Sequence, residues 1–485
     1  MRESTEVVTA PCGPVRGSWR PTTSPAVRSA AFLGIPFAQP PVGALRFQAP
    51  VRMPPWTHVL DATRPGPTPQ RRTGGELTTI PEPSFAGEAT LNVNVFTPAP
   101  GDESALLPVF VWIHGGGYFA GSPSSPWYDG AAFNRDGVVT VSISYRLGFD
   151  GFGWMEGAPL NRGLRDQLCA LDWVRDNITA FGGDPRRVTI GGQSAGGGSV
   201  LTLLGSPAAQ TLFRGAVSQS GAVADLPYEV AERLGRRMAA SADIQPTWEA
   251  WSQVDHDRIL DLEAAARAED GMMEPLAMLA GGARLGFAPV VDGEILLRPS
   301  IAAIAAGQGS KVRLLAGTTE HEFTGMGEAL AGAIGDGTAE DLLISAGWEP
   351  DRAAAFTERH ASLGSEALIA GQAITAGTFT DCLTRVLDAR TEADPDTQTW
   401  AYRFTWPWPD GLSSHCLEIP FVFDHLDAER VEQSLGKNPP QALADAMHGD
   451  WVAFITGRDP AWRQWGPEQP RERRTYGHDV ALESV

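Results

Sequence analysis

Ser194 lies in a short glycine-rich pattern that is typical of a nucleophilic serine. The residues Gly192-Gln-Ser194-Ala-Gly196 follow the β-branched run 188–191 and precede a leucine-rich stretch. A serine at a tight turn from strand to helix exposes its hydroxyl, and glycines are needed beside it because larger side chains would clash. In a chain with 54 glycines the pattern can also arise by chance. A phosphate-binding glycine loop is a further alternative, but the lysine that it needs beside the hydroxyl is missing.

A second glycine run lies upstream, where His114-Gly115-Gly116-Gly117 closes the strongly apolar segment 108–114. Consecutive glycines let backbone N–H groups approach a substrate closely, as an oxyanion hole requires. An ordinary glycine-rich turn explains this run equally well by itself. Two such runs, each at the end of an apolar strand, favour one catalytic site for acyl transfer.

The elements that would position these residues alternate along the chain. Short apolar or β-branched runs alternate with helical stretches, which predicts the α/β class with a mostly parallel, twisted sheet and helices on both faces. Helical spacing of apolar residues predicts helices over 166–177 and 441–455. The expected strands cover 108–114, 138–145, 188–191, 215–219, 312–316 and 400–404.

The remaining segments suggest one elaborated domain over residues 1–485. The first hundred residues are rich in proline and turn residues and predict short antiparallel strands and loops. Segments 228–280 and 325–395 are rich in alanine and glutamate, and we expect them to be helical insertions over the active site. No glycine/serine linker or internal repeat divides the chain.

Composition excludes several partners. The formal net charge of −20 disfavours nucleic acid and anionic membranes, because phosphates would be repelled. No apolar stretch is long enough to span a membrane, and no signal peptide is visible. The cysteines are scattered and form neither a disulfide framework nor a zinc cluster, so a cytoplasmic protein without metal or cofactor is expected. They are Cys12, Cys169, Cys382 and Cys416.

Longer motifs make the chain resemble the type-B carboxylesterases, the family of para-nitrobenzyl esterases and cholinesterases, nearly from end to end. The resemblance implies the α/β-hydrolase fold. The motifs are Gly34-Ile-Pro-Phe-Ala-Gln-Pro-Pro-Val-Gly-Ala-Leu-Arg46-Phe47, Asn161-Arg-Gly-Leu-Arg-Asp-Gln-Leu168, Phe181-Gly-Gly-Asp-Pro185, Phe213-Arg-Gly-Ala-Val-Ser-Gln-Ser220-Gly221 and Phe287-Ala-Pro-Val-Val-Asp-Gly293.

The same resemblance implies the other catalytic groups. The acid of the family follows a strand-closing glycine by five residues, and here Gly317-Thr-Thr-Glu320-His-Glu322 puts Glu322 at that offset, with Glu320 as the alternative. The histidine opens an H-x-x-E segment, which His415-Cys-Leu-Glu418 matches; Glu418 is expected to be structural. The order serine, acid, histidine is that of α/β-hydrolases. Without the resemblance, His360, His425, His448 and His478 would compete with His415.

The chain departs from the family pattern in three places, one of which is Tyr118, where Trp or Phe usually follows the glycine run. Glu88-Ala89-Thr90-Leu91 stands where the family has a segment with a cysteine, so the disulfide of secreted members cannot form. By resemblance, Arg46 and Glu88 are expected to form a buried ion pair. Phe323 replaces the glycine expected after the acid.

These residues imply a serine carboxylesterase that forms an acyl-enzyme. His415 is the expected general base and acid, Glu322 orients it, and the amides of Gly116, Gly117 and Ala195 bind the oxyanion. Tyr118 and Phe119 are the expected substrate-binding residues.

The aromatic segment 404–408 is either a further pocket lining or part of the core. The expected substrate is a neutral short-acyl or aryl ester, and the expected oligomeric state is a monomer or homodimer. Alternatives are a carbamate or amide hydrolase with the same triad, a non-catalytic binding protein of the same fold, and a nucleotide-binding oxidoreductase, which the missing dinucleotide fingerprint disfavours.

Overall fold

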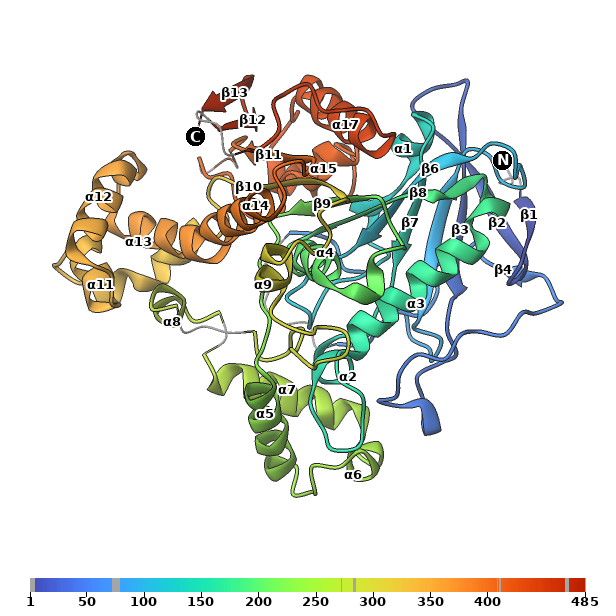
Figure 1. Ribbon diagram of the computed structural model, residues 1–485, viewed down its shortest axis with the longest axis horizontal. Coiled ribbons are helices and arrows are strands. Elements are labelled where there is room, and N and C mark those ends of the chain that lie inside the picture. The colour runs from blue at the N-terminus through green and yellow to red at the C-terminus, as the bar shows by residue number, and fades with distance from the viewer. Residues whose placement is uncertain are drawn as a thin grey trace.

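One large twisted sheet runs through the molecule (Figure 1). The computed structural model describes residues 5–71, 79–271, 273–281, 285–407, 409, 411–466 and 471–484. Within them the sheet has 13 strands in the order β1-β2-β3-β5-β7-β6-β8-β9-β10-β11-β12-β13, with β4 paired to β2. This arrangement confirms the predicted α/β class.

The predicted strands form the parallel centre of the sheet. Neighbours from β7 through β6, β8, β9, β10 and β11 to β12 pair in parallel. Several begin or end a few residues from their expected bounds, and the strand expected at 188–191 is longer. The bounds are β6 (Leu107–Ile113), β7 (Val139–Ile143), β8 (Gly183–Gln193), β9 (Gly215–Gln219), β10 (Arg313–Thr319) and β11 (Thr399–Phe404).

Antiparallel strands complete both edges. The expected N-terminal strands pair antiparallel with one another, and β5 continues this pairing onto β7. The antiparallel hairpin of β12 and β13 at the other edge was not expected from the sequence. The bounds are β1 (Thr5–Ala10), β2 (Gly13–Pro21), β3 (Arg28–Pro36), β4 (Leu60–Asp61), β5 (Asn92–Thr97), β12 (Glu472–Tyr476) and β13 (Val480–Ser484).

Helices cover both faces of the sheet because the central strands are apolar on both sides. Val111 of β6 lies in one core cluster with residues of α3 and α4, and Trp112 lies in the other with residues of α15 and α17. The expected helix 441–455 has the predicted bounds, whereas the helix expected at 166 begins at Arg162. The helices are α1 (Ala131–Arg135), α2 (Gly148–Phe152), α3 (Arg162–Asn177), α4 (Ala195–Gly205), α9 (Ser300–Ala305), α15 (Ile419–Val422), α16 (Val431–Leu435) and α17 (Gln441–Ile455).

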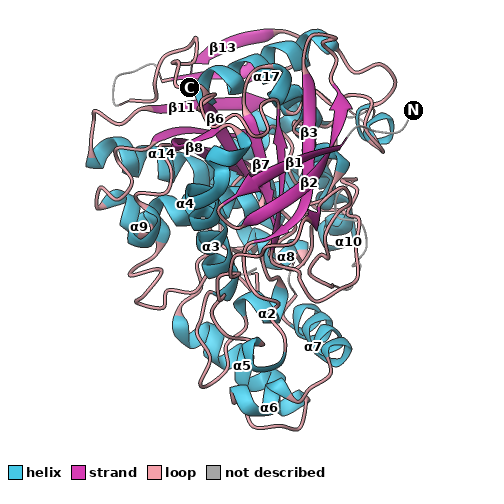
Figure 2. Ribbon diagram, turned by 90° about the vertical axis from the view of Figure 1, so that its right-hand side faces the viewer, coloured by secondary structure: helices cyan, strands magenta, loops and turns pink. Residues whose placement is uncertain are grey.

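The segments 228–280 and 325–395 are helical, as expected. The first contributes α5 (Tyr228–Ser241), α6 (Trp248–Ser252), α7 (His256–Glu269) and α8 (Pro275–Leu279). The second contributes α10 (Ala331–Ile334), α11 (Ala339–Ser345), α12 (Pro350–His360), α13 (Glu366–Thr375), the π-helical turn η7 (Ala376–Thr380) and α14 (Asp381–Ala393). Helices α5, α6 and α7 lie together at one end of the molecule in both views (Figure 1, Figure 2). Leu279 of α8 and the residues Leu343, Ala370 and Ile374 of the second insertion share a small core apart from that of the sheet.

The expected ion pair of Arg46 and Glu88 is wrong. The Arg46 guanidinium donates to the carbonyl oxygens of Ser252 and Val254, at 3.3 and 2.6 Å, and Glu88 is exposed. The first insertion therefore supplies the acceptors that the carboxylate was expected to supply. A buried ion pair occurs instead between Arg146 and Asp166, with 2.7 Å between Nη2 and Oδ1.

Candidate active site

Ser194 occupies the sharp turn between β8 and α4 in a backbone conformation that non-glycine residues rarely adopt. Its φ and ψ are 58° and −125°, and such strain persists only where the surroundings impose it. The flanking glycines are sterically required. A Cβ on Gly196 would lie 2.0 Å from the carbonyl oxygen of Ile113, and one on Gly192 would lie 2.5 Å from the backbone of Gly196.

The glycine run after β6 lies beside this turn. Ile113 pairs with Gly192 at the carboxyl ends of β6 and β8, so both loops leave the sheet at the same edge. A Cβ on Gly115 would lie 3.0 Å from Cβ of Ser194. Gly116 and Gly117 have φ of 111° and 59°, which glycine adopts without strain.

The amides expected to bind an oxyanion are not engaged elsewhere. Among the described residues, no acceptor is paired with the N–H groups of Gly116, Gly117 or Ala195. Ala195 is the first residue of α4, where the backbone N–H has no partner inside the helix. The arrangement can therefore receive a negative charge between the two loops.

Glu322 and His415 are in direct contact. The Nδ1–H of His415 donates to Oε2 of Glu322, while Oε1 of the same carboxylate accepts the backbone N–H of Thr319 at 2.8 Å. Both side chains are buried. Glu322 follows the end of β10, so its carboxylate lies at the same edge of the sheet as the nucleophile turn.

The neighbours of Glu322 are directed elsewhere. Glu320 forms an ion pair with Arg403 on β11, and the ring of His321 accepts the backbone N–H of Ser413 at 3.0 Å. The cluster of Glu320, His321 and Glu322 thus has three separate partners, and only Glu322 faces His415.

The pKa of His415 is raised well above its ordinary value of 6.5. Burial by itself favours the neutral ring, but the adjacent Cys416 side chain and the carboxylate of Glu322 beside Nδ1 together outweigh this effect by stabilising the imidazolium. Burial also raises the pKa of the Cys416 thiol. Glu322, hydrogen-bonded to Nδ1, is therefore one of the two groups that make His415 a stronger base.

The other ring nitrogen of His415 contacts Gln193, the residue before the serine. The Gln193 side-chain amide nitrogen lies 3.2 Å from Nε2. The Ser194 hydroxyl is partly exposed and has no hydrogen-bond partner among the described residues. The structure thus places His415 at the nucleophile turn without a direct bond to Oγ, which is common when no substrate is bound.

Two phenylalanines that pack on each other and on the His415 ring were not identified as site residues from the sequence. The rings of Phe323 and Phe379 each have their centroids 5.0 Å from that of His415, and they lie 4.9 Å from each other. In the sequence, Phe323 stands out only as a departure from the family pattern. Phe379 belongs to η7, a π-helical turn of the kind frequent at functional sites.

Gln219 and Glu418 form a buried polar pair next to the nucleophile turn. Gln219 accepts the backbone N–H of Ser194 at 2.9 Å and donates its side-chain amide to Glu418 at 3.2 Å. Oε2 of Glu418 is buried without a partner among the described residues. Burial, followed by repulsion from Glu322, raises the pKa of Glu418 to about 7.

The expected substrate-binding residues lie in different surroundings. The Tyr118 ring is buried in the core against Phe152, at 5.0 Å between centroids, and Phe119 is 8% exposed beside Gly117. Phe404 is buried in the core, and Trp406 packs against His478 at 4.7 Å. The structure therefore favours the core alternative for the aromatic segment 404–408, of which Phe404 and Trp406 are described. Trp408 lies outside the described residues.

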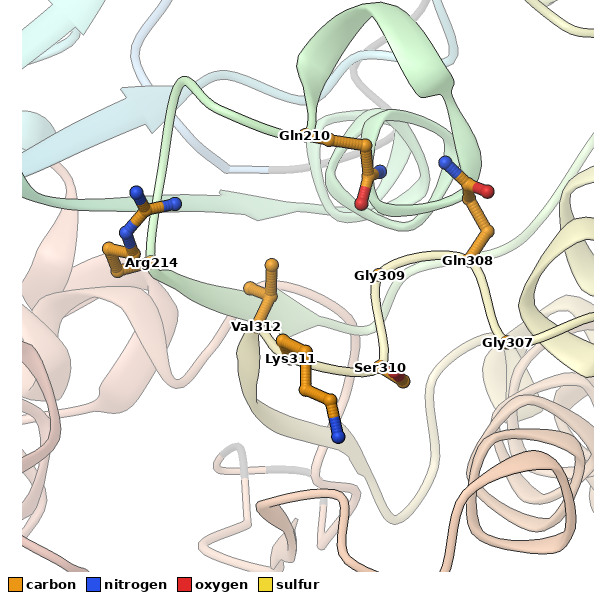
Figure 3. Close-up of a pocket in the computed structure, with 8 residues that line it drawn as sticks. All are labelled: Gln210, Arg214, Gly307, Gln308, Gly309, Ser310, Lys311 and Val312. Carbon is orange, nitrogen blue, oxygen red and sulfur yellow. The ribbon is translucent and has the colours of Figure 1, made fainter.

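A surface pocket of about 310 Å³ lies at the amino-terminal ends of the parallel strands, opposite the ends where Ser194 and Glu322 lie (Figure 3). Its lining includes Gln210 and Arg214, just before β9, and the loop 307–312, just before β10. The nucleophile and its partners follow the carboxyl ends of β8 and β10. This pocket is therefore distinct from the candidate active site.

Two further findings describe the chain as a whole. All four cysteines are buried and free. Within the described ranges, no helix combines the length and the apolar character that crossing a membrane would need.

Comparisons with known proteins agree on one family. A family model described as "Carboxylesterase family" matches residues 4–478. Para-nitrobenzyl esterase of Bacillus subtilis (strain 168) is 34% identical over 99% of this chain and 96% of its own length. Phenmedipham hydrolase of Pseudarthrobacter oxydans is 33% identical over 89% of this chain and 87% of its own.

Solved structures give the same result. A carboxylesterase of Geobacillus stearothermophilus has a TM-score of 0.82 at 30% identity, covering 99% of this chain and 97% of the other. A thermophilic para-nitrobenzyl esterase has a TM-score of 0.80 at 30% identity, covering 99% and 98%.

Proposed function

The chain belongs to the carboxylesterase family and is a serine carboxylesterase, and we propose that Ser194 is the residue acylated during its reaction. The observation that carries this assignment is the strained backbone of Ser194 at the turn from β8 to α4, beside the glycine run. A serine in this position presents its hydroxyl at the edge of the sheet where His415 and Glu322 also lie.

His415 acts as general base and then as general acid. As Oγ of Ser194 attacks the ester carbonyl, Nε2 leaves the Gln193 amide and takes the hydroxyl proton, and Glu322 stabilises the resulting imidazolium through Nδ1–H. His415 next protonates the leaving alcohol, and water hydrolyses the acyl-enzyme.

The amides of Gly116, Gly117 and Ala195 stabilise the tetrahedral oxyanion. Their lack of partners in the described part of the chain supports this role. Removal of one such donor typically costs about 10²–10³ in rate.

Labelling with an organophosphate tests the nucleophile. Diethyl p-nitrophenyl phosphate should modify Ser194 alone, located by mass mapping of the digest, and Ser194→Ala should lose both labelling and esterase activity. Ser220→Ala is the matched control, because this buried serine also has a positive φ, of 49°, at the end of a central strand. Full activity in Ser194→Ala, or an adduct at another serine, would refute the assignment.

Neutral short-acyl or aryl esters are the proposed substrates. Phe323 offers partly exposed, uncharged aromatic surface in contact with His415, and apolar surfaces bind neutral groups by burial of area. The test compares kcat/KM for p-nitrophenyl acetate, butyrate and palmitate and for a choline ester. Preference for the palmitate or the choline ester would contradict the proposal.

A carbamate hydrolase is the second candidate function. The likeness to phenmedipham hydrolase favours it, and the same triad would serve for the chemistry. Turnover of phenmedipham that disappears in Ser194→Ala would establish it as an additional activity.

The domain organisation, the cellular compartment and the oligomeric state are further parts of the proposal. We propose one elaborated catalytic domain whose insertions 228–280 and 325–395 border the active site, since Phe379 reaches His415. Four free buried cysteines support a reducing cytoplasm. A monomer or homodimer is proposed, to be determined by sedimentation.

A further inference from the structure

Arg267 on α7 stacks on the ring that follows the oxyanion glycines. Its guanidinium carbon lies 3.9 Å from the centroid of the Phe119 ring. The Arg267 side chain is only 16% exposed, and its Nε forms a 3.9 Å ion pair with Oε1 of Glu263 on the same helix. A guanidinium this far removed from water interacts favourably with an aromatic face. The stacking therefore links the first insertion to the oxyanion loop.

Glu263 reaches the same region from one helical turn earlier on α7. Its Oε2 accepts the backbone N–H of Phe149 at 3.1 Å, and a Cβ on Gly148 would lie 2.0 Å from the carboxylate. The N–H of Gly148 in turn donates to the carbonyl oxygen of Tyr118 at 2.7 Å. Residues 263 and 267 lie on one face of α7 because they are four apart. The helix thus restrains both the Phe119 ring and the backbone just before it.

The Phe119 ring also touches the glycine whose amide is proposed to bind the oxyanion. A Cβ on Gly117 would lie 2.6 Å from the Phe119 ring, and the N–H of Phe119 donates to the carbonyl oxygen of Gly116 at 3.0 Å. Displacement of the ring would therefore displace the Gly117 peptide. Small displacements matter, because an oxyanion hole works through donors that are already in place.

We propose that Arg267 and Glu263 are positioning residues that hold the oxyanion loop through Phe119 and the 148–149 backbone. The proposal rests on the proposed function, since it assigns a catalytic role to the Gly117 amide. It gives the first insertion a part in transition-state stabilisation, although neither side chain belongs to the triad.

The substitutions distinguish an effect on the position of the oxyanion loop from an effect on the stability of the fold. Arg267→Met keeps an unbranched apolar stem and removes the cation, and Arg267→Lys restores charge without the planar stack. Burial raises the pKa of Glu263 to about 7, so Glu263→Gln imitates its neutral form and keeps an acceptor for Phe149, whereas Glu263→Ala removes the acceptor. Arg236→Met is the matched control, because Arg236 stacks on Trp154 at 4.8 Å in the same insertion.

The readout is turnover per active site, with sites counted by the organophosphate burst. Arg267→Met and Glu263→Ala should each lower kcat and kcat/KM for p-nitrophenyl acetate and butyrate about tenfold with KM little changed, the signature of an interaction made in the transition state. Affinity for a trifluoromethyl ketone, which forms an oxyanion on serine, should fall in proportion. Arg267→Lys should recover part of the activity, Glu263→Gln most of it, and Arg236→Met should match the wild type.

Three results would contradict the proposed positioning role of Arg267 and Glu263. One is unchanged turnover per titrated site in Arg267→Met and Glu263→Ala, with only fewer sites or a lower Tm. Another is a loss confined to KM for an anionic ester such as p-nitrophenyl hemisuccinate, which would make Arg267 a substrate contact. A third is an equal loss in Arg236→Met. Failure of the proposed function is distinguishable, because it would show as activity retained in Ser194→Ala.

Discussion

The side-chain amide of Gln193 lies 3.2 Å from Nε2 of His415, on the ring nitrogen that must receive the serine proton. The residue before the nucleophile therefore competes with Ser194 for the base. In a neutral ring whose Nδ1–H faces Glu322, Nε2 is an acceptor and the amide donates to it. Attack by Ser194 requires this contact to be exchanged.

Gln193→Glu should shift the pH dependence of activity to higher pH. A carboxylate at this position would stabilise the imidazolium from the side of Nε2, so the pKa of His415 would rise further and the active neutral ring would form only at higher pH. The measurement is kcat/KM for p-nitrophenyl acetate against pH. A shift to lower pH would contradict the contact.

Activity of the wild-type enzyme should increase with pH through a transition above 6.5, because the pKa of His415 is raised from that value and only its neutral form accepts the serine proton. Glu322→Gln should lower kcat by about 10⁴, as loss of the orienting acid does in a serine triad, and should move the transition to lower pH.

Glu320→Gln is the matched control for that variant. Glu320 forms a partly buried pair with Arg403 and does not contact His415, so its loss should change activity only slightly. The reverse ranking of the two variants would identify Glu320 as the acid.

Phe379→Leu should lower kcat severalfold without unfolding the protein, because the ring that packs on His415 from η7 is replaced by a smaller apolar group. Phe356→Leu in the same insertion is the control, since the Phe356 ring packs on Trp348 at 5.3 Å and, within the described part of the chain, on no ring of the triad. Activity per titrated site should separate the two variants, and equal losses would show that only the insertion had been destabilised.

Glu418→Gln should stabilise the protein at alkaline pH and leave it unchanged in acid. The pKa of Glu418 is raised from 4.5 to about 7 in the folded state, so the folded state binds more protons between these values and stability falls as pH rises through them. A neutral glutamine escapes this loss.

Urea unfolding at about pH 5 and about pH 8 tests the difference, which should grow by roughly 2–3 kcal/mol toward the higher pH. Glu358→Gln, at an exposed position of α12, is the control and should show no such growth. A constant difference for Glu418→Gln would contradict the prediction.

The sequence predicted most of the central sheet and the two glycine loops, because strand periodicity and the steric needs of a sharp turn are local properties. Gly196 illustrates this, since its Cβ would collide with the strand beside it. His415 and Glu322 needed the family resemblance, because nothing in their spacing distinguishes them from other histidines and carboxylates.

Contacts between segments that are distant in the chain could not be predicted from the sequence. Arg46 donates to backbone carbonyl groups of the first insertion and not to Glu88. Because every residue has a backbone carbonyl group, the residue types could not predict these acceptors. Phe379 and Arg267 likewise look like ordinary helical residues until the insertions are packed against the site.

The second insertion, residues 325–395, lies between the acid Glu322 and the base His415 in the chain, and the ring of its Phe379 touches His415. Helices α11 to α13 of this insertion share with α8 a small apolar core apart from that of the sheet, so this part can open as a separate cooperative unit. Sub-global unfolding of that unit would separate proton acceptor from carboxylate while the strands remain paired. Esterase activity would then depend on whether the second insertion is folded. On heating, activity would be lost before the sheet structure seen by circular dichroism.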